Sequence, residues 1–384
     1  MVAGRSRTYI PALDGIRFSA MTLVYIEHAG APQVIPGRFG VTVFFFLSGF
    51  LITTLLRSEF QETGTISFRH FYLRRFLRIF PPMWAVLAFG CILAYAGVMS
   101  APEPLALAAM LTNVTNYVMV FSEGIPYELG PFWSLGVEEH YYLLFPVAYL
   151  FMLNRGVSSR NQTLILVGVA MALLGWRAVL QLSGVDYERV QLASDTRMDS
   201  LLWGAVLAIA LNPVMDRPRT FRLVPGLSIL GVAGLVLFAT FQILYKPGGV
   251  LFALTFTLQG LALIPIFYIG IMHHDWPVFR WLDWRPIRYL GTISYMMYLV
   301  HMPLLALFDS LAPEVDMVTR GILVFGATAG VGHLSYVFME RPLGGLRRRL
   351  HARGTAAPVT PPETSSPMPP RRRRVVGEVR PGTR

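Results

Sequence analysis

Residues 9–29 read YIPALDGIRFSAMTLVYIEHA, a stretch apolar and long enough to cross a membrane that nevertheless contains Arg17 and His28. At 100° per residue, the eleven steps between them make about three helical turns, so both side chains would emerge on one face roughly 16 Å apart. Ionisable side chains are costly inside a membrane, which makes this pair a functional candidate. A structural alternative is that Arg17 pairs with nearby Asp14 and that His28 is hydrated at the interface. The stretch predicts a transmembrane helix that offers a cation and an imidazole to a common ligand.

Similar apolar stretches recur throughout the chain. Its 384 residues are 54% hydrophobic and 14% charged, and the charge-poor stretches have the length of helices of about 20 residues. They predict an all-α, polytopic transmembrane helical bundle of about ten spans. We expect these spans near residues 9–29, 39–57, 79–99, 134–153, 162–182, 198–212, 222–244, 250–272, 288–309 and 318–339.

One further segment, residues 105–121 (LALAAMLTNVTNYVMVF), is apolar enough to cross the membrane. A span there would invert the orientation of everything downstream, which the charges of the later loops oppose. Asn113, Thr115 and Asn116 also interrupt the apolar run. We therefore expect a re-entrant or interfacial helix on the outer side.

Loop charges predict the orientation of the bundle in the cell membrane. With the N-terminus in the cytoplasm, the inner loops carry most of the arginines, in agreement with the usual enrichment of positive charge on that side. The outer loops then hold only Arg38, Arg189, Arg197, Lys246 and Arg320. In this orientation His28 lies near the outer face, and Arg75 and Arg78 lie near the inner one.

The net charge of +11 is concentrated at the C-terminal end, where residues 341–384 contain eleven Arg and two Glu. Repeated prolines and few apolar residues predict that this tail is disordered. We expect a membrane domain over residues 1–343 and an Arg- and Pro-rich cytoplasmic tail over residues 344–384. Because no aromatic and basic platform or recognition helix accompanies the tail, we expect it to contact membrane lipid rather than nucleic acid.

A cluster of arginines in FYLRRFLRIFPP, residues 71–82, is the second chemical feature. Arg75 and Arg78 are three residues apart and can converge on one anion from a helix. Guanidinium groups suit phosphate because they donate two parallel hydrogen bonds. The alternative is that the cluster only reflects the charge bias of cytoplasmic helix ends. Pro81 and Pro82 predict a boundary before the third span.

The motif WSLGVEEHYYLLFP, residues 133–146, places two carboxyl groups at the outer entrance of a span. Glu138 and Tyr142 share a helix face, whereas Glu139 points about 100° away. Glu138 is suited to orient His28 and to stabilise its protonated form during proton transfer. The alternative is that acidic residues are favoured near a helix N-terminus by the helix dipole.

Weaker signals come from the other polar and sulfur-containing residues of the spans. Ser48 and Gly49 in FFFLSGFLIT are typical of close helix packing, although the hydroxyl of Ser48 is also available to a substrate. His301 in SYMMYLVHMP has two interpretations, a hydrogen-bonded structural histidine or a substrate contact. Cys91, the single cysteine, excludes an internal disulfide, and the sequence contains no metal-binding signature.

Six segments in a fixed order, LDGIRFSAMTLVYIEH, FFFLSGFLITTLL, FYLRRFLRIFPPMW, FWSLGVEEHYYLLFP, SYMMYLVHMP and MERPL, together resemble the membrane-bound acyltransferase-3 family. Its members include O-acyltransferases that acetylate bacterial surface glycans, nodulation factors and macrolides. The family's R-x10-H motif falls on Arg17 and His28, and its R-x-x-R motif on Arg75 and Arg78. Its WSL-x-x-E element falls on Glu138.

The resemblance implies an integral membrane O-acyltransferase that moves an acyl group, commonly acetyl, from cytoplasmic acyl-CoA to a hydroxyl of a glycan, glycolipid or macrolide-like acceptor. We expect Arg17, Arg75 and Arg78 to bind the donor and His28, held by Glu138, to act as general base. No permanently bound cofactor and no metal is expected, since acyl-CoA is a co-substrate. We expect supporting roles for Asp14, Ser48, Glu139, Tyr142 and His301.

Two other classes of function remain open from the sequence. A transporter or flippase of a small polar or lipid-linked substrate would also use a polar path through ten spans, although such proteins usually contain internal repeats, which this sequence does not display. A receptor or scaffold without catalytic activity would use Arg17 and His28 only for folding.

Overall fold

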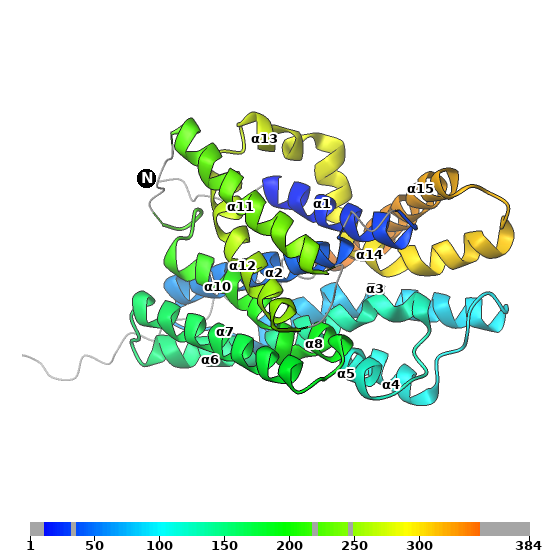
Figure 1. The fold of residues 1–384 in the computed structure, drawn as a ribbon, viewed down its shortest axis with the longest axis horizontal. Coiled ribbons are helices and arrows are strands. Elements are labelled where there is room, and N and C mark those ends of the chain that lie inside the picture. Colours follow the sequence, from blue (N-terminus) through cyan, green and yellow to red (C-terminus); the bar gives the residue numbers. More distant parts are fainter. Residues whose placement is uncertain (1–10, 32–35, 217–221, 245–248, 346–384) are drawn as a thin grey trace, which may run out of the picture.

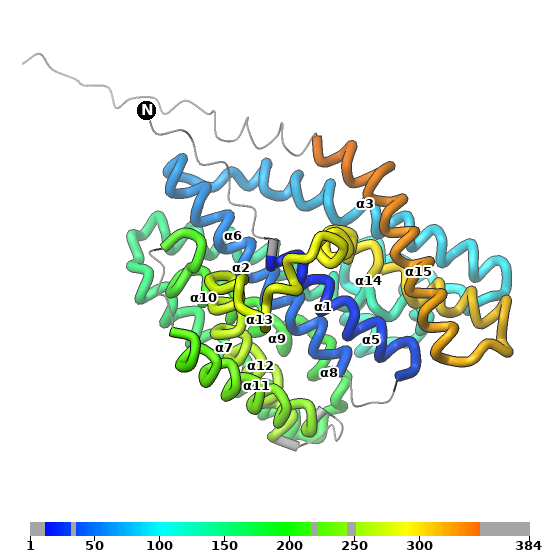
Figure 2. The backbone as a smooth tube through the Cα atoms, turned by 90° about the horizontal axis from the view of Figure 1, so that it is seen from above, coloured from blue at the N-terminus to red at the C-terminus, as the bar shows by residue number. Residues whose placement is uncertain are grey.

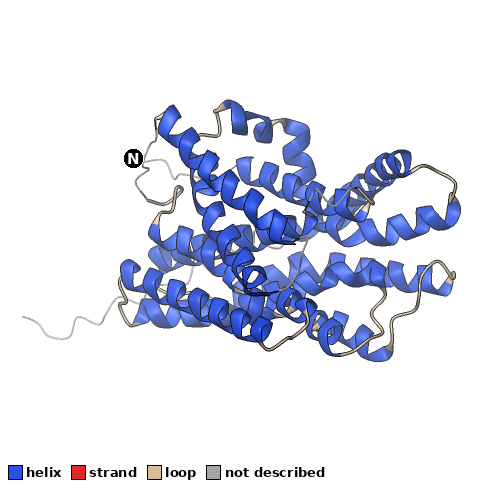
Figure 3. Cartoon of the chain, viewed as in Figure 1, coloured by secondary structure: helices blue, strands red, loops and turns tan. Residues whose placement is uncertain are grey.

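The computed structural model describes residues 11–31, 36–216, 222–244 and 249–345, and in these ranges every regular element is helical (Figure 3). The prediction of an all-α bundle is therefore confirmed. Nearly all of the predicted basic tail, residues 346–384, lies outside the described ranges, so its disorder and its lipid contacts stay predictions.

Within the described ranges, nine helices have 18 residues or more: α1 (Pro11–His28), α2 (Gly37–Thr63), α3 (Phe68–Tyr95), α6 (Trp133–Asn154), α7 (Ser159–Leu182), α11 (Leu223–Leu244), α12 (Gly249–Met272), α14 (Arg285–Leu311) and α15 (Met317–Ser335). The shorter elements are α4 (Pro104–Thr112), α5 (Thr115–Phe121), η1 (Tyr127–Phe132), α8 (Tyr187–Leu192), α9 (Ser194–Arg197), α10 (Asp199–Ala210), α13 (Pro277–Arg280), η2 (Trp281–Asp283) and η3 (Tyr336–Glu340).

Each of the ten predicted spans coincides with a helix. By length and composition, seven of the described helices could cross a membrane, and α1, α6 and α10 are not among the seven. The protein is thus a multi-pass membrane protein, while the number of ten spans stays a prediction. Helix α10 has 12 residues and is only about 18 Å long, well short of a bilayer of about 30 Å.

The apolar segment 105–121 does not form one helix. Helices α4 and α5 are joined at Asn113, which has a left-handed backbone conformation with φ of 58°. Asparagine adopts this conformation more readily than most residues. The side-chain amide of Asn116 donates to the Leu192 carbonyl and to Ser194 Oγ, which ties α5 to α8 and α9. Asn113 and Asn116 therefore break the run and anchor it to the protein.

The helices divide into an interior set and an outer set. In their most apolar windows, α2, α12 and α14 are 67–72% buried, whereas α7, α11 and α15 are 17–22% buried. Figures 1 and 2 show α11 and α15 at the periphery of the bundle, and α1 lies against both α2 and α14. The helix with the predicted Arg and His pair thus packs against two interior helices.

The prolines of the arginine cluster do not end a helix. The third span was predicted to begin at residue 79, but α3 begins at Phe68 and runs through Pro81 and Pro82 to Tyr95. Prolines are tolerated in membrane helices when neighbours satisfy the disturbed backbone groups. The carbonyls that Pro81 and Pro82 leave without an N–H partner are those of Leu77 and Arg78. The hydroxyl of Tyr295 on α14 donates to the next carbonyl, that of Ile79, at 2.8 Å. The predicted boundary is therefore wrong, and the cluster lies within one continuous helix.

Two glycine contacts bring the central helices together. A Cβ atom added at Gly291 would lie 1.8 Å from the carbonyl oxygen of Asp14, and one at Gly49 would lie 1.9 Å from the carbonyl oxygen of Leu201. Helix α14 thus packs on α1, and α2 on α10, backbone against backbone, as small residues permit in membrane proteins. The packing interpretation of Gly49 agrees with this contact.

Replacement of Gly291 by alanine is expected to destabilise the fold by about 1–3 kcal/mol or more, because the backbone of α1 or α14 must move. The same replacement at Gly330 on α15, whose Cβ would meet nothing within 4 Å, is the matched control. There the better helix propensity of alanine predicts no loss of stability. Thermal unfolding of both variants in detergent tests the contact, and equal midpoints would contradict it.

Candidate functional site: two adjoining cavities

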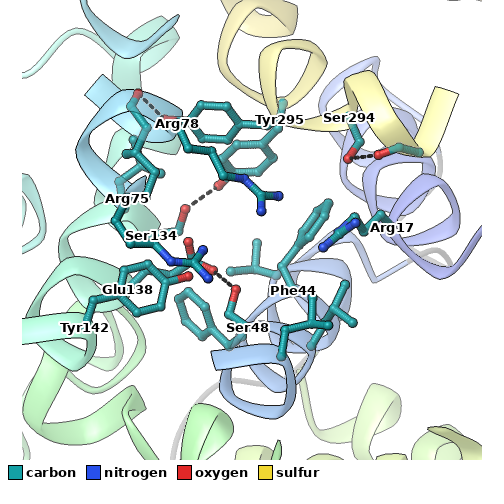
Figure 4. Close-up of a pocket in the computed structure, with 18 of the residues that line it drawn as sticks. Arg17, Phe44, Ser48, Arg75, Arg78, Ser134, Glu138, Tyr142, Ser294 and Tyr295 are labelled. Atoms are coloured by element: carbon teal, nitrogen blue, oxygen red, sulfur yellow. Dashed lines mark hydrogen bonds between the residues drawn. The ribbon is translucent and has the colours of Figure 1, made fainter. Parts of the chain in front are cut away.

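A cavity of about 100 Å³ opens between α1, α2, α3, α6 and α14 and contains most of the predicted site residues. Its wall includes Arg17, Arg75, Arg78, Ser48, Glu138 and Tyr142, and we call it the Arg cavity (Figure 4). Five helices from distant parts of the sequence thus contribute polar side chains to one space. Its three arginines outnumber its one carboxylate, so the charge of the wall is positive.

The guanidinium groups approach the Arg cavity from opposite sides. Figure 4 shows Arg75 and Arg78 extending from α3 and Arg17 extending toward them from α1. Arg17 also pairs with Asp14 at 2.6 Å, which is the structural contact considered from the sequence. Neither Arg75 nor Arg78 has an ion-pair partner within 4 Å in the part of the chain that the structure describes. The cavity can therefore attract an anion.

Glu138 lies in the Arg cavity and accepts a hydrogen bond from Ser48 Oγ at 2.7 Å. The guanidinium carbon of Arg75 on α3 lies 5.1 Å from the centre of the Tyr142 ring on α6, so Tyr142 helps to hold that arginine. In the described structure, His28 contacts His301 and not Glu138. The prediction that Glu138 holds His28 is therefore not met by the contacts.

The reason lies in the position of Glu138 along its helix. Trp133, at the start of α6, lines a second cavity, described below, that contains His28. Glu138 follows Trp133 by about 7 Å along the helix axis. That distance places the carboxylate beside Ser48 instead. Glu139 lines neither cavity, and its buried Oε1 has no hydrogen-bond partner among the described residues.

A second, larger cavity of about 490 Å³ contains His28, and we call it the His cavity. Aromatic rings of Tyr127, Trp133 and Tyr187 share its wall with the polar side chains of Glu27, Arg38, Glu188 and Gln191. Aromatic faces combined with a few polar groups are typical of pockets that bind organic ligands. These aromatic residues come mainly from η1 and α8, outside the predicted spans.

The segment before α10 is fixed by Asp195. Its carboxylate accepts hydrogen bonds from Arg189 at 2.6 Å and from the indole N–H of Trp176 at 2.8 Å. Burial alone would raise the pKa of this carboxyl group, but the bonds from Arg189 and Trp176 lower it below its ordinary value. The bond from Arg189 holds α9 to α8, whose Tyr187 and Gln191 line the His cavity, and the bond from Trp176 holds α9 to α7.

His28 is paired with a second histidine. Its Nδ1 lies 2.9 Å from Nε2 of His301, and the two rings are nearly parallel, with centres 5.1 Å apart. His301 is fully buried, and its Nδ1 lies 2.6 Å from the Tyr298 carbonyl oxygen. It is not part of either cavity wall. Of the two interpretations of His301, the hydrogen-bonded one matches the contacts.

The two cavities adjoin. Val41 on α2 and Tyr298 on α14 belong to both walls, and the hydroxyl of Tyr298 bonds with Ser134 Oγ and the Pro131 carbonyl. Along α1 the Arg cavity is lined by Arg17 and the His cavity by residues 24–28. Helix α14 lines the cavities in the same order and α2 in the opposite order. The face predicted from the spacing of Arg17 and His28 therefore opens on both cavities in turn.

Several wall residues were not identified from the sequence. Tyr298 lies three residues before His301 on α14, and this spacing is the signal that could have linked the two. Glu27 accepts hydrogen bonds from the backbone N–H groups of Gly37 and Arg38, a contact between two helix ends that no local pattern reports. Among the described residues there is no group of three or more potential metal ligands.

Comparison with known proteins gives two concordant findings. A family model described as an acyltransferase domain matches residues 10–337. The peptidoglycan O-acetyltransferase OatA of Listeria monocytogenes is 30% identical over 368 residues, covering 88% of this chain and 56% of that protein. The O-acetyltransferase OatA of Staphylococcus aureus is 32% identical over 355 residues, covering 88% and 58%. The chain thus spans little more than half the length of these relatives. No solved structure matches it.

Proposed function

Because the chain belongs to the acyltransferase-3 family, we propose that it is a membrane O-acetyltransferase that transfers an acetyl group from acetyl-CoA to a hydroxyl of an envelope glycan. The names of its relatives support an O-acetyl transfer, and one of them names peptidoglycan. The resemblance noted in the sequence is confirmed by the family match.

The observation that carries the proposal is the pair of adjoining cavities. One contains Arg17, Arg75 and Arg78, and the other contains His28. Guanidinium groups suit the phosphates of a CoA donor, and an imidazole suits the removal of a hydroxyl proton. Val41 and Tyr298, which line both cavities and which we call the partition, mark where an acyl group at the end of the donor's arm would meet the acceptor.

We assign the Arg cavity to the donor and the His cavity to the acceptor. In the orientation expected from the loop charges, the donor then binds from the cytoplasm and the glycan from the outside. His28 takes the hydroxyl proton as the acceptor oxygen attacks the thioester carbonyl. The C–S bond breaks, and His28 returns the proton to the leaving thiolate. Ester and free CoA are the products.

The proposal is tested with the purified full chain in lipid vesicles, supplied with acetyl-CoA and soluble peptidoglycan fragments. Release of free thiol that depends on the fragments, together with a gain of one acetyl group on them by mass spectrometry, is the expected result. A transporter or flippase would move substrate without releasing thiol. Absence of thiol release with every glycan fragment tried, from protein that binds CoA, would contradict the proposal.

A further inference from the structure

We propose that His301 is a positioning residue that fixes His28 in the tautomer with a bare Nε2, so that this nitrogen is the base that faces the acceptor. The inference rests on the proposed function, because it specifies how the transfer base is prepared. It is drawn from three groups in a row: the Tyr298 carbonyl, the His301 ring and the His28 ring.

The order of donors and acceptors in this row is determined by its first member. A carbonyl oxygen can only accept a hydrogen bond, so His301 must carry its proton on Nδ1, which lies 2.6 Å from the Tyr298 oxygen. In a neutral imidazole the other nitrogen is then an acceptor. His301 Nε2 therefore accepts from His28, and His28 must carry its own proton on Nδ1, 2.9 Å away.

This assignment leaves Nε2 of His28 with a free lone pair. His28 lines the His cavity, while its Nδ1 is occupied by the buried His301. The opposite tautomer would point two lone pairs at each other between the rings and would leave Nε2 protonated. A histidine in that state could not remove a proton from a hydroxyl.

The hydrogen bond from His28 to His301 also persists after the proton has moved. When His28 Nε2 takes the hydroxyl proton, the ring becomes cationic, and its Nδ1–H still donates to the neutral His301. The orienting partner in a catalytic triad acts in this way on its histidine, holding the ring and supporting its charge. Here a backbone carbonyl and a second imidazole provide that support, and no carboxylate is needed.

The surroundings of His301 keep the row in place. The ring of Tyr25 lies 6.2 Å from the His301 ring in an edge contact, and the ring of Tyr298 lies 5.9 Å away. Tyr25 is itself anchored, because its hydroxyl donates to the Gly321 carbonyl on α15 at 2.6 Å. His301 thus has little freedom to turn its ring and exchange its two nitrogens.

Two replacements of similar size separate this role from packing. In His301→Gln the amide oxygen can take the place of Nε2 and accept from His28, whereas in His301→Leu no acceptor remains. We expect His301→Leu to lower kcat by about 10-fold or more, between the loss seen for partners that orient metal-bound histidines and that seen for the orienting carboxylate of a catalytic triad. KM for acetyl-CoA should stay unchanged, and His301→Gln should recover most of kcat. Equal kcat values for the two variants, both folded by size-exclusion chromatography, would overturn the inference.

A measurement on the wild-type chain does not depend on either variant folding. In protein labelled with [15N]histidine in lipid vesicles, the nitrogen resonances of His28, identified by their loss in His28→Gln, should show a protonated Nδ1 and a bare Nε2. A protonated Nε2 would overturn the inference and the assignment of His28 as base, whereas acetyl transfer itself would still be measured by thiol release. Failure of the proposed function would instead appear as absence of glycan-dependent thiol release from the wild-type chain, whatever the tautomer of His28.

Discussion

Replacement of His28 by alanine is expected to lower kcat of acetyl transfer by about 100- to 10,000-fold, the range that a positioned general base contributes. Binding of the donor should be retained, because the arginines that we assign to it line the other cavity. Because Val41 and Tyr298 lie between the two cavities, the loss of His28 is expected to affect transfer and not CoA binding. A variant that binds CoA normally but does not transfer is therefore the expected phenotype.

The measurement compares the dissociation constant of CoA, by calorimetry, with the rate of thiol release in the presence of glycan. His274→Ala is the matched control, since His274 is exposed, pairs with Asp283 and belongs to neither cavity wall. It should leave both quantities unchanged. A His28→Ala protein with wild-type turnover would remove His28 from the mechanism.

Replacement of Arg75 or Arg78 by alanine is expected to have its largest effect on the affinity for the donor. A hydrogen bond to a charged group contributes about 1.5–3 kcal/mol, so each substitution should raise the dissociation constant of CoA by about 10- to 150-fold. The charges of Arg75 and Arg78 also act on the buried Glu138 in the same cavity, so each replacement is expected to lower stability as well as CoA affinity. Thermal unfolding of each variant measures the part of the effect that is due to stability.

Lysine variants refine this prediction. Arg75→Lys and Arg78→Lys keep the charge but lose the two parallel donors, so we expect an affinity between those of the wild type and the alanine variants. Arg69→Ala is the control, because Arg69 is exposed near the start of α3 and outside both cavities. If CoA affinity were the same in all these proteins, the Arg cavity would not be the donor site.

Much of the site follows from helical periodicity. The spacing of Arg17 and His28, and that of Arg75 and Arg78, predicted which pairs share a face of one helix. Arg75 and Arg78 line one cavity, whereas Arg17 and His28, expected to serve a common ligand, line two adjoining cavities. Such predictions succeed because 3.6 residues per turn is a local property of the chain. The same reasoning identified Glu138 and Tyr142 as neighbours.

Contacts between helices could not be predicted in this way. Whether Glu138 meets His28 or Ser48 depends on how far α6 is displaced along α1 and α2, and tertiary packing determines that displacement. His301 is 273 residues from His28, and no pattern in either segment reports their contact. The prolines of α3 misled for a related reason, since the hydroxyl that supports the helix there comes from Tyr295 on another element.

The partition at Val41 and Tyr298 also affects the free energy of transfer across the bilayer, because it determines which part of the donor has to cross. A nucleotide with several negative charges would have to give up its hydration shell to cross, at a cost of several kcal/mol or more for each charge. In the proposed reaction the coenzyme stays on the side from which it came, and only a neutral two-carbon fragment changes sides. Neither an ion gradient nor nucleotide hydrolysis is then required, because the thioester itself supplies the driving force.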